Sequence, residues 1–304
     1  MAYAVMFPGQ GSQFVGMADA WAEHPAGLEV LVEASAVLGR SIAAGCHDEG
    51  ALATTAFVQP ALLACDVAAF RVLRAQGLTD VVGLAGHSLG EFAALVAAGA
   101  MELPDALELV VARGAAMQRA GKERPGAMAA LLGVGADDAE ALCSEARSGD
   151  VLVVANRNSP AQSVVSGSVP AIERLEALAK QRKIRTVRLQ VAGAFHSELM
   201  RPAVKPVLVA LDRIEIRDPE IPIAENVTGE LVIDAGRLRE LVSEHVVSPV
   251  RWETGIRNLA AAGARIFLEA GPGEVLTKLM KRIDPELAAS AVADPASARV
   301  ALAT

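Results

Sequence analysis

The pentapeptide Gly86-His87-Ser88-Leu89-Gly90 has the residue types expected around a nucleophilic serine. An apolar run from Val81 precedes it, and a stretch of small residues to Ala100 predicts a helix after it. A strand that reverses sharply into a helix crowds the backbone, so only glycine fits on either side of the turning residue. Ser88 is therefore predicted to project its hydroxyl at the positive end of a helix dipole, where negative charge develops during acyl transfer. The alternative interpretation is an ordinary glycine-rich turn.

His196 is the candidate general base. It follows the loop Ala192-Gly193-Ala194-Phe195 and precedes a helix expected to begin at Ser197. A loop at a domain junction can carry a base across a cleft to a nucleophile. His87 adjoins Ser88 and is expected to point away from it. The remaining histidines suggest no clear role: His24, His47 and His245.

A loop from Pro8 to Gln13 follows an expected strand, Tyr3 to Phe7. It does not fit the dinucleotide pattern GxGxxG, and the chain contains no GxxxxGK[ST], which disfavours nucleotide binding. Such a loop can instead direct a backbone N–H at an oxyanion, beside the N–H of the residue after the nucleophile, Leu89. Gln10 is the candidate for this second donor; a simple turn is the alternative.

Arg113 lies on a helix expected to run from about Pro104 to Ala120. Its neighbours three and four residues away are all apolar: Leu109, Val110, Ala116 and Met117. A buried guanidinium needs an anion, which must come from another segment or from a ligand. A snorkelling or structurally paired arginine is the alternative.

The order of predicted elements indicates an α/β fold with an insertion. After residue 126 the expected elements alternate as strand, helix, strand, strand, helix and strand: Ala127–Val134, Asp137–Ala146, Val151–Asn156, Gln162–Ser166, Pro170–Arg182 and Thr186–Val191. This βαββαβ order is ferredoxin-like. Between its second and third strands, the polar segment Asn156 to Pro160 either lines a site or only makes the turn.

The flanking segments return to an α/β pattern and close the larger domain from both ends of the chain. The expected elements are a helix over Gln59–Gln76 with Pro60 in its first turn, a strand over Ile221–Asn226, a helix before His245, a helix that follows the segment Ser248 to Trp252 and runs to Ala262, a strand over Arg265–Glu269 and a helix opened by Gly271-Pro272-Gly273. Lys278, Lys281 and Arg282 share one helical face. They form either a solvated surface or a patch for an acidic partner.

Composition narrows the function class. The 304 residues are 52% hydrophobic, enough for a substantial core, and neither a basic N-terminal region followed by an apolar run nor an apolar span of bilayer length is evident. We therefore expect a cytoplasmic protein without a membrane partner. Three scattered cysteines without a CxxC pair indicate neither a disulfide framework nor a zinc site. A net charge of −8 and only 3% aromatic residues disfavour a nucleic-acid groove.

Six short motifs, taken in their order along the chain, resemble those of one known family. PGQGSQ, GHSLGE, an arginine 25 residues after the serine, NSPAQ, AFHS and GPGEVL together resemble the malonyl-coenzyme A:acyl-carrier-protein transacylase family over almost the entire length. The resemblance implies an α/β-hydrolase-like large subdomain, residues 1–124 and 195–304, with a ferredoxin-like small subdomain, residues 125–194, inserted into it.

The resemblance also implies roles for individual residues. They are Ser88 as nucleophile, His196 as base, the N–H groups of Gln10 and Leu89 as oxyanion hole, Arg113 as the holder of the substrate carboxylate, and Phe195 and Asn158 in the substrate pocket. A backbone carbonyl near Pro249-Val250-Arg251 would orient the histidine. The bulk of Phe195 favours malonyl over acyl groups branched at the α-carbon.

The implied reaction is a ping-pong transfer of malonyl from malonyl-coenzyme A (CoA) to the phosphopantetheine thiol of an acyl carrier protein, through malonyl-Ser88 and without a metal or redox cofactor. The first alternative is a stand-alone polyketide-synthase acyltransferase of different acyl selectivity. A serine esterase or thioesterase would gain nothing from a cation such as Arg113 on the acyl side. A carrier-to-carrier acyltransferase would be expected to lack that arginine, and a silent docking subunit to lack Ser88 or His196.

Overall fold

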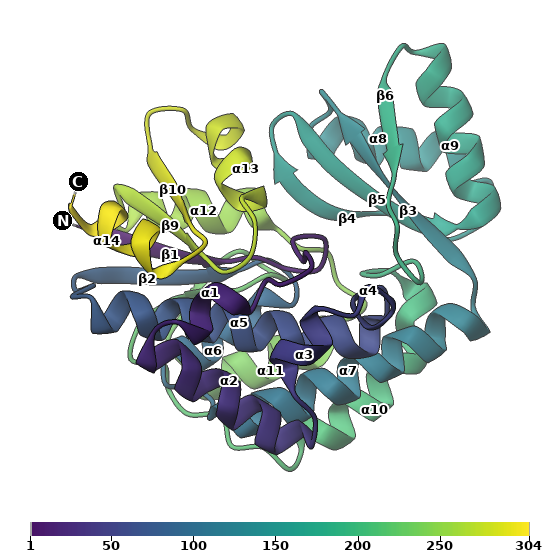
Figure 1. Cartoon of the computed structure of the whole chain (residues 1–304). Coiled ribbons are helices and arrows are strands. Elements are labelled where there is room, and N and C mark those ends of the chain that lie inside the picture. Colours follow the sequence, from purple (N-terminus) through teal and green to yellow (C-terminus); the bar gives the residue numbers. More distant parts are fainter. Residues whose placement is uncertain (1, 304) are drawn as a thin grey trace.

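The computed structural model describes residues 2–303 and contains two β-sheets (Figure 1). The larger sheet has the order β10-β9-β1-β2-β7-β8. Its strands are β1 (Tyr3–Phe7), β2 (Val81–Gly86), β7 (Ile223–Ala224), β8 (Leu231–Val232), β9 (Ile266–Ala270) and β10 (Ala288–Val292). Neighbouring strands run parallel except β7 and β8, which are antiparallel. Parallel strands end at a common edge, and β2 brings Ser88 to it.

Helices cover both faces of the larger sheet, and its central strand β1 is accordingly apolar and buried at every position. Val5 and Phe7 of β1 belong to a core shared with α5 (Thr55–Ala75) and α6 (Gly90–Ala97). Ala4 and Met6 point the other way and pack with α12 (Trp252–Ala261) and α13 (Val275–Ile283). The alternation along one strand thus divides the core into two layers.

The smaller sheet contains β3 (Gly126–Leu132), β4 (Leu152–Ser159), β5 (Gln162–Ser168) and β6 (Arg185–Arg188), in the antiparallel order β4-β5-β3-β6. Helices α8 (Ala136–Ala146) and α9 (Val169–Gln181) pack on one of its faces. The chain order β3-α8-β4-β5-α9-β6 is the βαββαβ order expected from the sequence. Strand β4 is joined to the segment just before residue 252, where the Val250 N–H donates to Ala155 O and the Arg157 N–H to Val250 O, both at 2.8 Å.

The other helices surround the larger sheet. They are α1 (Asp19–Ala22), α2 (Pro25–Leu38), α3 (Ile42–Cys46), α4 (Glu49–Leu52), α7 (Leu103–Glu123), the 3-10 helix Glu198–Met200, α10 (Arg201–Leu211), α11 (Ala235–Glu244) and α14 (Pro295–Ala303). Figure 1 shows α2, α5, α6, α7 and α10 together on the side of the sheet away from α12 and α13.

Three expectations about local structure are wrong. The segment Asn156 to Ser159 is not a turn but the end of β4, where bulges in the pairing with β5 accommodate its polar residues. Strand β6 ends at Arg188, so 189–191 leave the sheet and line the cavity described below. Helix α5 begins at Thr55, which places Pro60 inside the helix and not in its first turn.

Helix α5 also corrects the expectation that no segment has the composition of a membrane span. The helix has 21 residues, and an 18-residue window within it has a mean hydropathy of 1.6, which is the length and composition that a membrane span would need. Within the fold, however, 89% of the apolar window is buried against other parts of the protein. This is the burial of a core helix, and the high hydropathy follows from contact with the sheet on one side and with helices on the other.

Candidate active site

Ser88 occupies a sharp turn between β2 and α6. Its φ of 51° is unusual for a residue with a side chain. A Cβ on Gly86 would lie 1.9 Å from the carbonyl carbon of Gly90, and one on Gly90 would lie 2.1 Å from the carbonyl oxygen of Phe7. The two glycines are therefore required by close backbone contact, as the sequence predicted, and the hydroxyl is presented at the carboxyl edge of the sheet.

Asn226 holds this turn in place. Its Oδ1 accepts the Ser88 N–H at 2.8 Å, its Nδ2 donates to Gly86 O at 2.7 Å, and its own N–H donates to Glu91 Oε2 at 2.9 Å. The residue is buried and lies just beyond β7, the neighbour of β2 in the sheet. The sequence analysis missed this role, although the position of Asn226 at the end of an expected strand was a usable signal.

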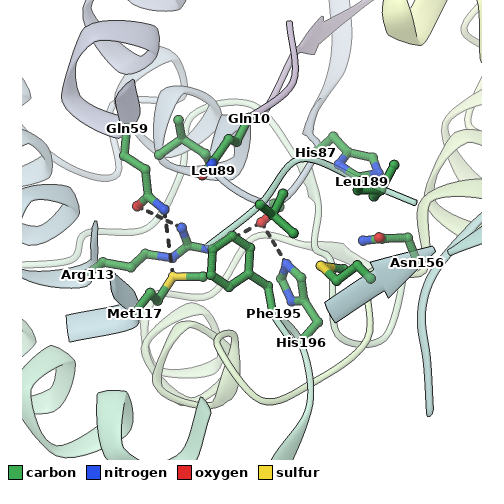
Figure 2. A pocket seen from close by; sticks show the side chains of 13 residues that line it. Gln10, Gln59, His87, Leu89, Arg113, Met117, Asn156, Leu189, Phe195 and His196 are labelled. Carbon is green, nitrogen blue, oxygen red and sulfur yellow. Dashed lines mark hydrogen bonds between the residues drawn. The ribbon is translucent and has the colours of Figure 1, made fainter. Parts of the chain in front are cut away.

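His196 contacts the serine hydroxyl directly (Figure 2). The distance from Ser88 Oγ to His196 Nε2 is 2.7 Å. On its other side, Nδ1 lies 2.9 Å from Ser248 O and 3.1 Å from His245 O. Carbonyl oxygens only accept, so Nδ1 carries the proton and Nε2 is left free to accept one from the serine. The orienting carbonyl of Ser248 adjoins the segment that the resemblance indicated.

The environment of His196 keeps its ring neutral. Burial, and next the positive charge of Arg113, lower the pKa of His196 from 6.5 to about 3. Both effects disfavour the imidazolium form in the resting protein. The ring is therefore in its basic form throughout the neutral pH range.

Arg113 is 1% exposed, so the snorkelling alternative is wrong. Its Nη1 donates to Gln59 Oε1 at 2.8 Å and its Nη2 to Ser88 Oγ at 3.1 Å, as the dashed lines in Figure 2 show. Burial lowers the pKa of Arg113 to about 10, although nearby Glu91 opposes the shift. The guanidinium thus stays charged at neutral pH, and its Nε has no partner within residues 2–303.

Gln10 and Leu89 present backbone N–H groups beside the serine. Both residues line the same cavity as Ser88. Within the described part of the chain, neither N–H donates to another protein group. Two unpaired N–H groups in the cavity of a nucleophile are the kind of donors that an oxyanion requires.

A narrow cavity of about 70 Å³ at Ser88 continues into a wider one of about 420 Å³. The two share the lining residues Gln10, His87, Asn156, Leu189 and Val191. The wider cavity lies between the smaller sheet, the Gly9 to Gln13 loop and α13. A long, thin molecule could therefore reach the serine from the space between the two sheets.

The structure separates the two residues predicted for the substrate pocket. Phe195 lines the narrow cavity beside Ser88. Asn158 lines only the wider cavity, where its Oδ1 lies 2.9 Å from Nε2 of His87. As expected, His87 is thus directed away from the serine. Gln59 and His245, which both contact Arg113, were not anticipated as site residues.

The chain is similar to known proteins over almost its entire length. A family model described as an acyl transferase domain matches residues 5–300. The malonyl CoA-acyl carrier protein transacylase of Bacillus subtilis (strain 168) is 38% identical over 306 residues, which cover 99% of this chain and 96% of the relative. The enzyme of that name from Escherichia coli (strain K12) is 40% identical over 304 residues, covering 99% of this chain and 98% of the relative.

Solved structures are similar to this chain along its full length. An acyl-carrier-protein S-malonyltransferase from Burkholderia pseudomallei 1710b is similar with a TM-score of 0.95 and 38% identity, covering 100% of both chains. A malonyl-transacylase solved in complex with a type II polyketide synthase acyl-carrier protein also has a TM-score of 0.95 and 38% identity, and covers 100% of this chain and 99% of that one. The chain therefore belongs to the acyl transferase domain family, among the malonyl-CoA:acyl carrier protein transacylases.

Proposed function

We propose that the protein transfers a malonyl group from malonyl-CoA to the phosphopantetheine thiol of an acyl carrier protein, through an acyl-serine intermediate. One observation carries the proposal. Ser88 Oγ lies 2.7 Å from the basic nitrogen of His196 and 3.1 Å from a guanidinium nitrogen of Arg113. The nucleophile thus sits between a base that can activate it and a cation that can hold an acidic acyl group.

In the first half-reaction, His196 Nε2 takes the proton of Ser88 while Oγ attacks the thioester carbonyl. The oxyanion accepts from the N–H groups of Gln10 and Leu89, and the loss of one such donor typically costs about 10²–10³ in rate. Collapse of the intermediate breaks the C–S bond, and His196 returns the proton to the departing CoA thiolate. Malonyl-Ser88 remains.

In the second half-reaction the carrier thiol gives its proton to His196 and attacks the ester carbonyl. The same N–H pair stabilises the second oxyanion, and Ser88 Oγ leaves with the proton from His196. The Nδ1 contacts to Ser248 O and His245 O stabilise the imidazolium in both half-reactions. No metal or redox cofactor takes part in this proposed sequence.

Arg113 supports malonyl as the acyl group. Its Nη1 is occupied by Gln59, whereas Nε has no partner in the described structure and Nη2 contacts Ser88. The unpartnered Nε and the Nη2 that faces Ser88 can bind the distal carboxylate by charge-assisted hydrogen bonds. An esterase or thioesterase, the third candidate function, has no use for a buried cation at this place. A polyketide acyltransferase of other selectivity stays the second candidate, because one similar structure contains a polyketide synthase carrier.

The wider cavity supports the proposal that CoA esters and a carrier protein are the two substrates. Its volume of about 420 Å³ and its position suit the pantetheine arm that CoA and the carrier protein have in common. We further propose a cytoplasmic enzyme with no nucleic-acid or membrane partner, and subdomain boundaries at 1–124, 125–194 and 195–304. The four-stranded sheet then forms a ferredoxin-like subdomain inserted into an α/β-hydrolase-like one.

Intact-protein mass spectrometry tests the proposal. The enzyme is mixed with malonyl-, methylmalonyl- and acetyl-CoA without carrier protein, beside the variant Ser88→Ala. We expect a malonyl adduct on the wild type that persists in water, and none on the variant. Free malonate without an adduct would favour a hydrolase, and neither adduct nor turnover would favour a silent docking subunit.

A further inference from the structure

His245 is a buried histidine whose side chain lies against Arg113. Its Nδ1 is 3.3 Å from Arg113 Nη2, and its Nε2 is 3.7 Å from Glu91 Oε2. The ring meets Phe92 edge to face, with centroids 5.8 Å apart, and His196 with centroids 5.5 Å apart. Only 1% of the residue is exposed, so its polar atoms depend on these neighbours.

The contacts define the protonation of the His245 ring. Arginine has donors only, so the nitrogen facing Nη2 must be the unprotonated one. Burial and the charge of Arg113 also lower the pKa of His245 well below its usual value, which keeps the ring neutral. The single ring proton then resides on Nε2, on the side of Glu91.

His245 and Gln59 together limit how the guanidinium can turn. Gln59 Oε1 accepts from Nη1 at 2.8 Å, and His245 Nδ1 faces Nη2. The Arg113 Cζ lies 5.5 Å from the centre of the Phe92 ring, which closes a third side. Three hydrogens remain: that of Nε, the second one of Nη1 and the second one of Nη2, of which the last contacts Ser88.

We propose that the imidazole of His245 is a positioning residue for Arg113, which fixes the guanidinium with the Nε hydrogen and the second Nη2 hydrogen directed at a carboxylate beside Ser88 and so sets the preference for acyl groups with a free acid. The inference rests on the proposed function, because it assumes that Arg113 binds the substrate carboxylate. It concerns the ring, whereas the carbonyl of His245 separately serves His196.

The replacement His245→Met tests the ring while the backbone carbonyl stays. Methionine fills a similar volume without a comparable acceptor, whereas His245→Gln offers a neutral amide oxygen and is the matched control. Initial rates with malonyl-CoA and acetyl-CoA give kcat and KM for each variant. For His245→Met we expect kcat/KM for malonyl-CoA to fall about tenfold, mainly through KM, as for the loss of one hydrogen bond to a charged group. The rate with acetyl-CoA should fall less than that with malonyl-CoA, because its acyl group has no carboxylate for Arg113 to bind, so the malonyl-to-acetyl ratio of kcat/KM decreases.

The control variant His245→Gln should retain most of the wild-type preference for malonyl-CoA over acetyl-CoA. Equal losses with both CoA esters would overturn the inference, because they would mean that the ring acts through His196 or the fold. So would a His245→Gln variant as impaired as His245→Met. His245→Leu replaces His245→Met if the latter does not fold.

Arg113→Ala separates this inference from the proposed function. If the arginine variant keeps its preference for malonyl-CoA, the carboxylate role of Arg113 is wrong. If Arg113→Ala loses that preference and His245→Met keeps it, only the inference about His245 is wrong. In the Arg113→Ala background, adding His245→Met should change the malonyl-to-acetyl ratio no further, since the ring acts through the missing guanidinium.

Discussion

The rate of Ser88 acylation should change little between about pH 6.5 and pH 5, where an ordinary histidine becomes protonated. A base with a pKa of 6.5 is about 3% neutral at pH 5, which would lower the rate about 30-fold relative to pH 8. Burial and Arg113 lower the pKa of His196 to about 3, so the ring is still neutral at pH 5. We expect the acylation rate to change less than about twofold between pH 8 and pH 5.

The measurement is a single-turnover acylation with acetyl-CoA, quenched and followed by intact mass across this pH range. Arg113→Ala removes the second cause of the shift, so its profile, scaled to its own plateau, should bend at higher pH than that of the wild type. A wild-type acylation rate that falls with an apparent pKa near 6.5 would refute the reasoning.

Folding must be checked at each pH of this experiment. The unfolded chain gains a proton on His196 below pH 6.5 and the native state does not, so the stability due to the neutral ring is lost as pH falls toward 3. At pH 5 this amounts to about 2 kcal/mol for this one group. Circular dichroism of the same samples identifies any rate loss that comes from unfolding.

Three further replacements test the site and its support. Asn226→Ala leaves Ser88 N–H and Gly86 O without partners, and should lower the free energy of unfolding in urea by at least about 2 kcal/mol; an unchanged midpoint would contradict this. Phe195→Ala should raise the ratio of methylmalonyl to malonyl adduct about tenfold in a competition followed by intact mass, and a constant ratio would exclude Phe195 as a steric filter. Gly90→Ala should prevent folding to soluble protein, because its Cβ would lie 2.1 Å from a β1 carbonyl oxygen; soluble, active protein would show that the turn can relax.

The sequence predicted those parts of the fold that depend on local patterning. Strand β1 and the βαββαβ order follow from apolar runs, and the glycines around Ser88 from the backbone contacts of a tight turn. The strand character of Asn156 to Ser159 could not be predicted, because pairing with β5 holds these polar residues in β4. Two of them, Asn156 and Asn158, line the wider cavity. Tertiary pairing there overrides residue preference.

The site shows the same division between local and non-local information. Ser88, His196 and Arg113 could be predicted because the residues near each of them in the chain indicate its role. The structure brings the three side chains together around the Ser88 hydroxyl. Asn226 and His245 act on residues more than 130 positions away, at separations of 138 and 132. The end of an expected strand indicates that Asn226 lies at the edge of the sheet, but nothing adjacent to Asn226 or His245 in the chain identifies the residue that each contacts.

The central place of β1 in the larger sheet has a consequence during protein synthesis. This first strand lies between β2 and β9, and β9 begins only at Ile266. At 5–20 residues per second, a ribosome needs roughly 13 to 50 s to add the intervening chain. Throughout that time one edge of β1 lacks its native neighbour and is open to pairing with other chains. The emerging polypeptide therefore depends on the cell's chaperones, or on its own helices, to shield that edge until β9 has left the ribosome.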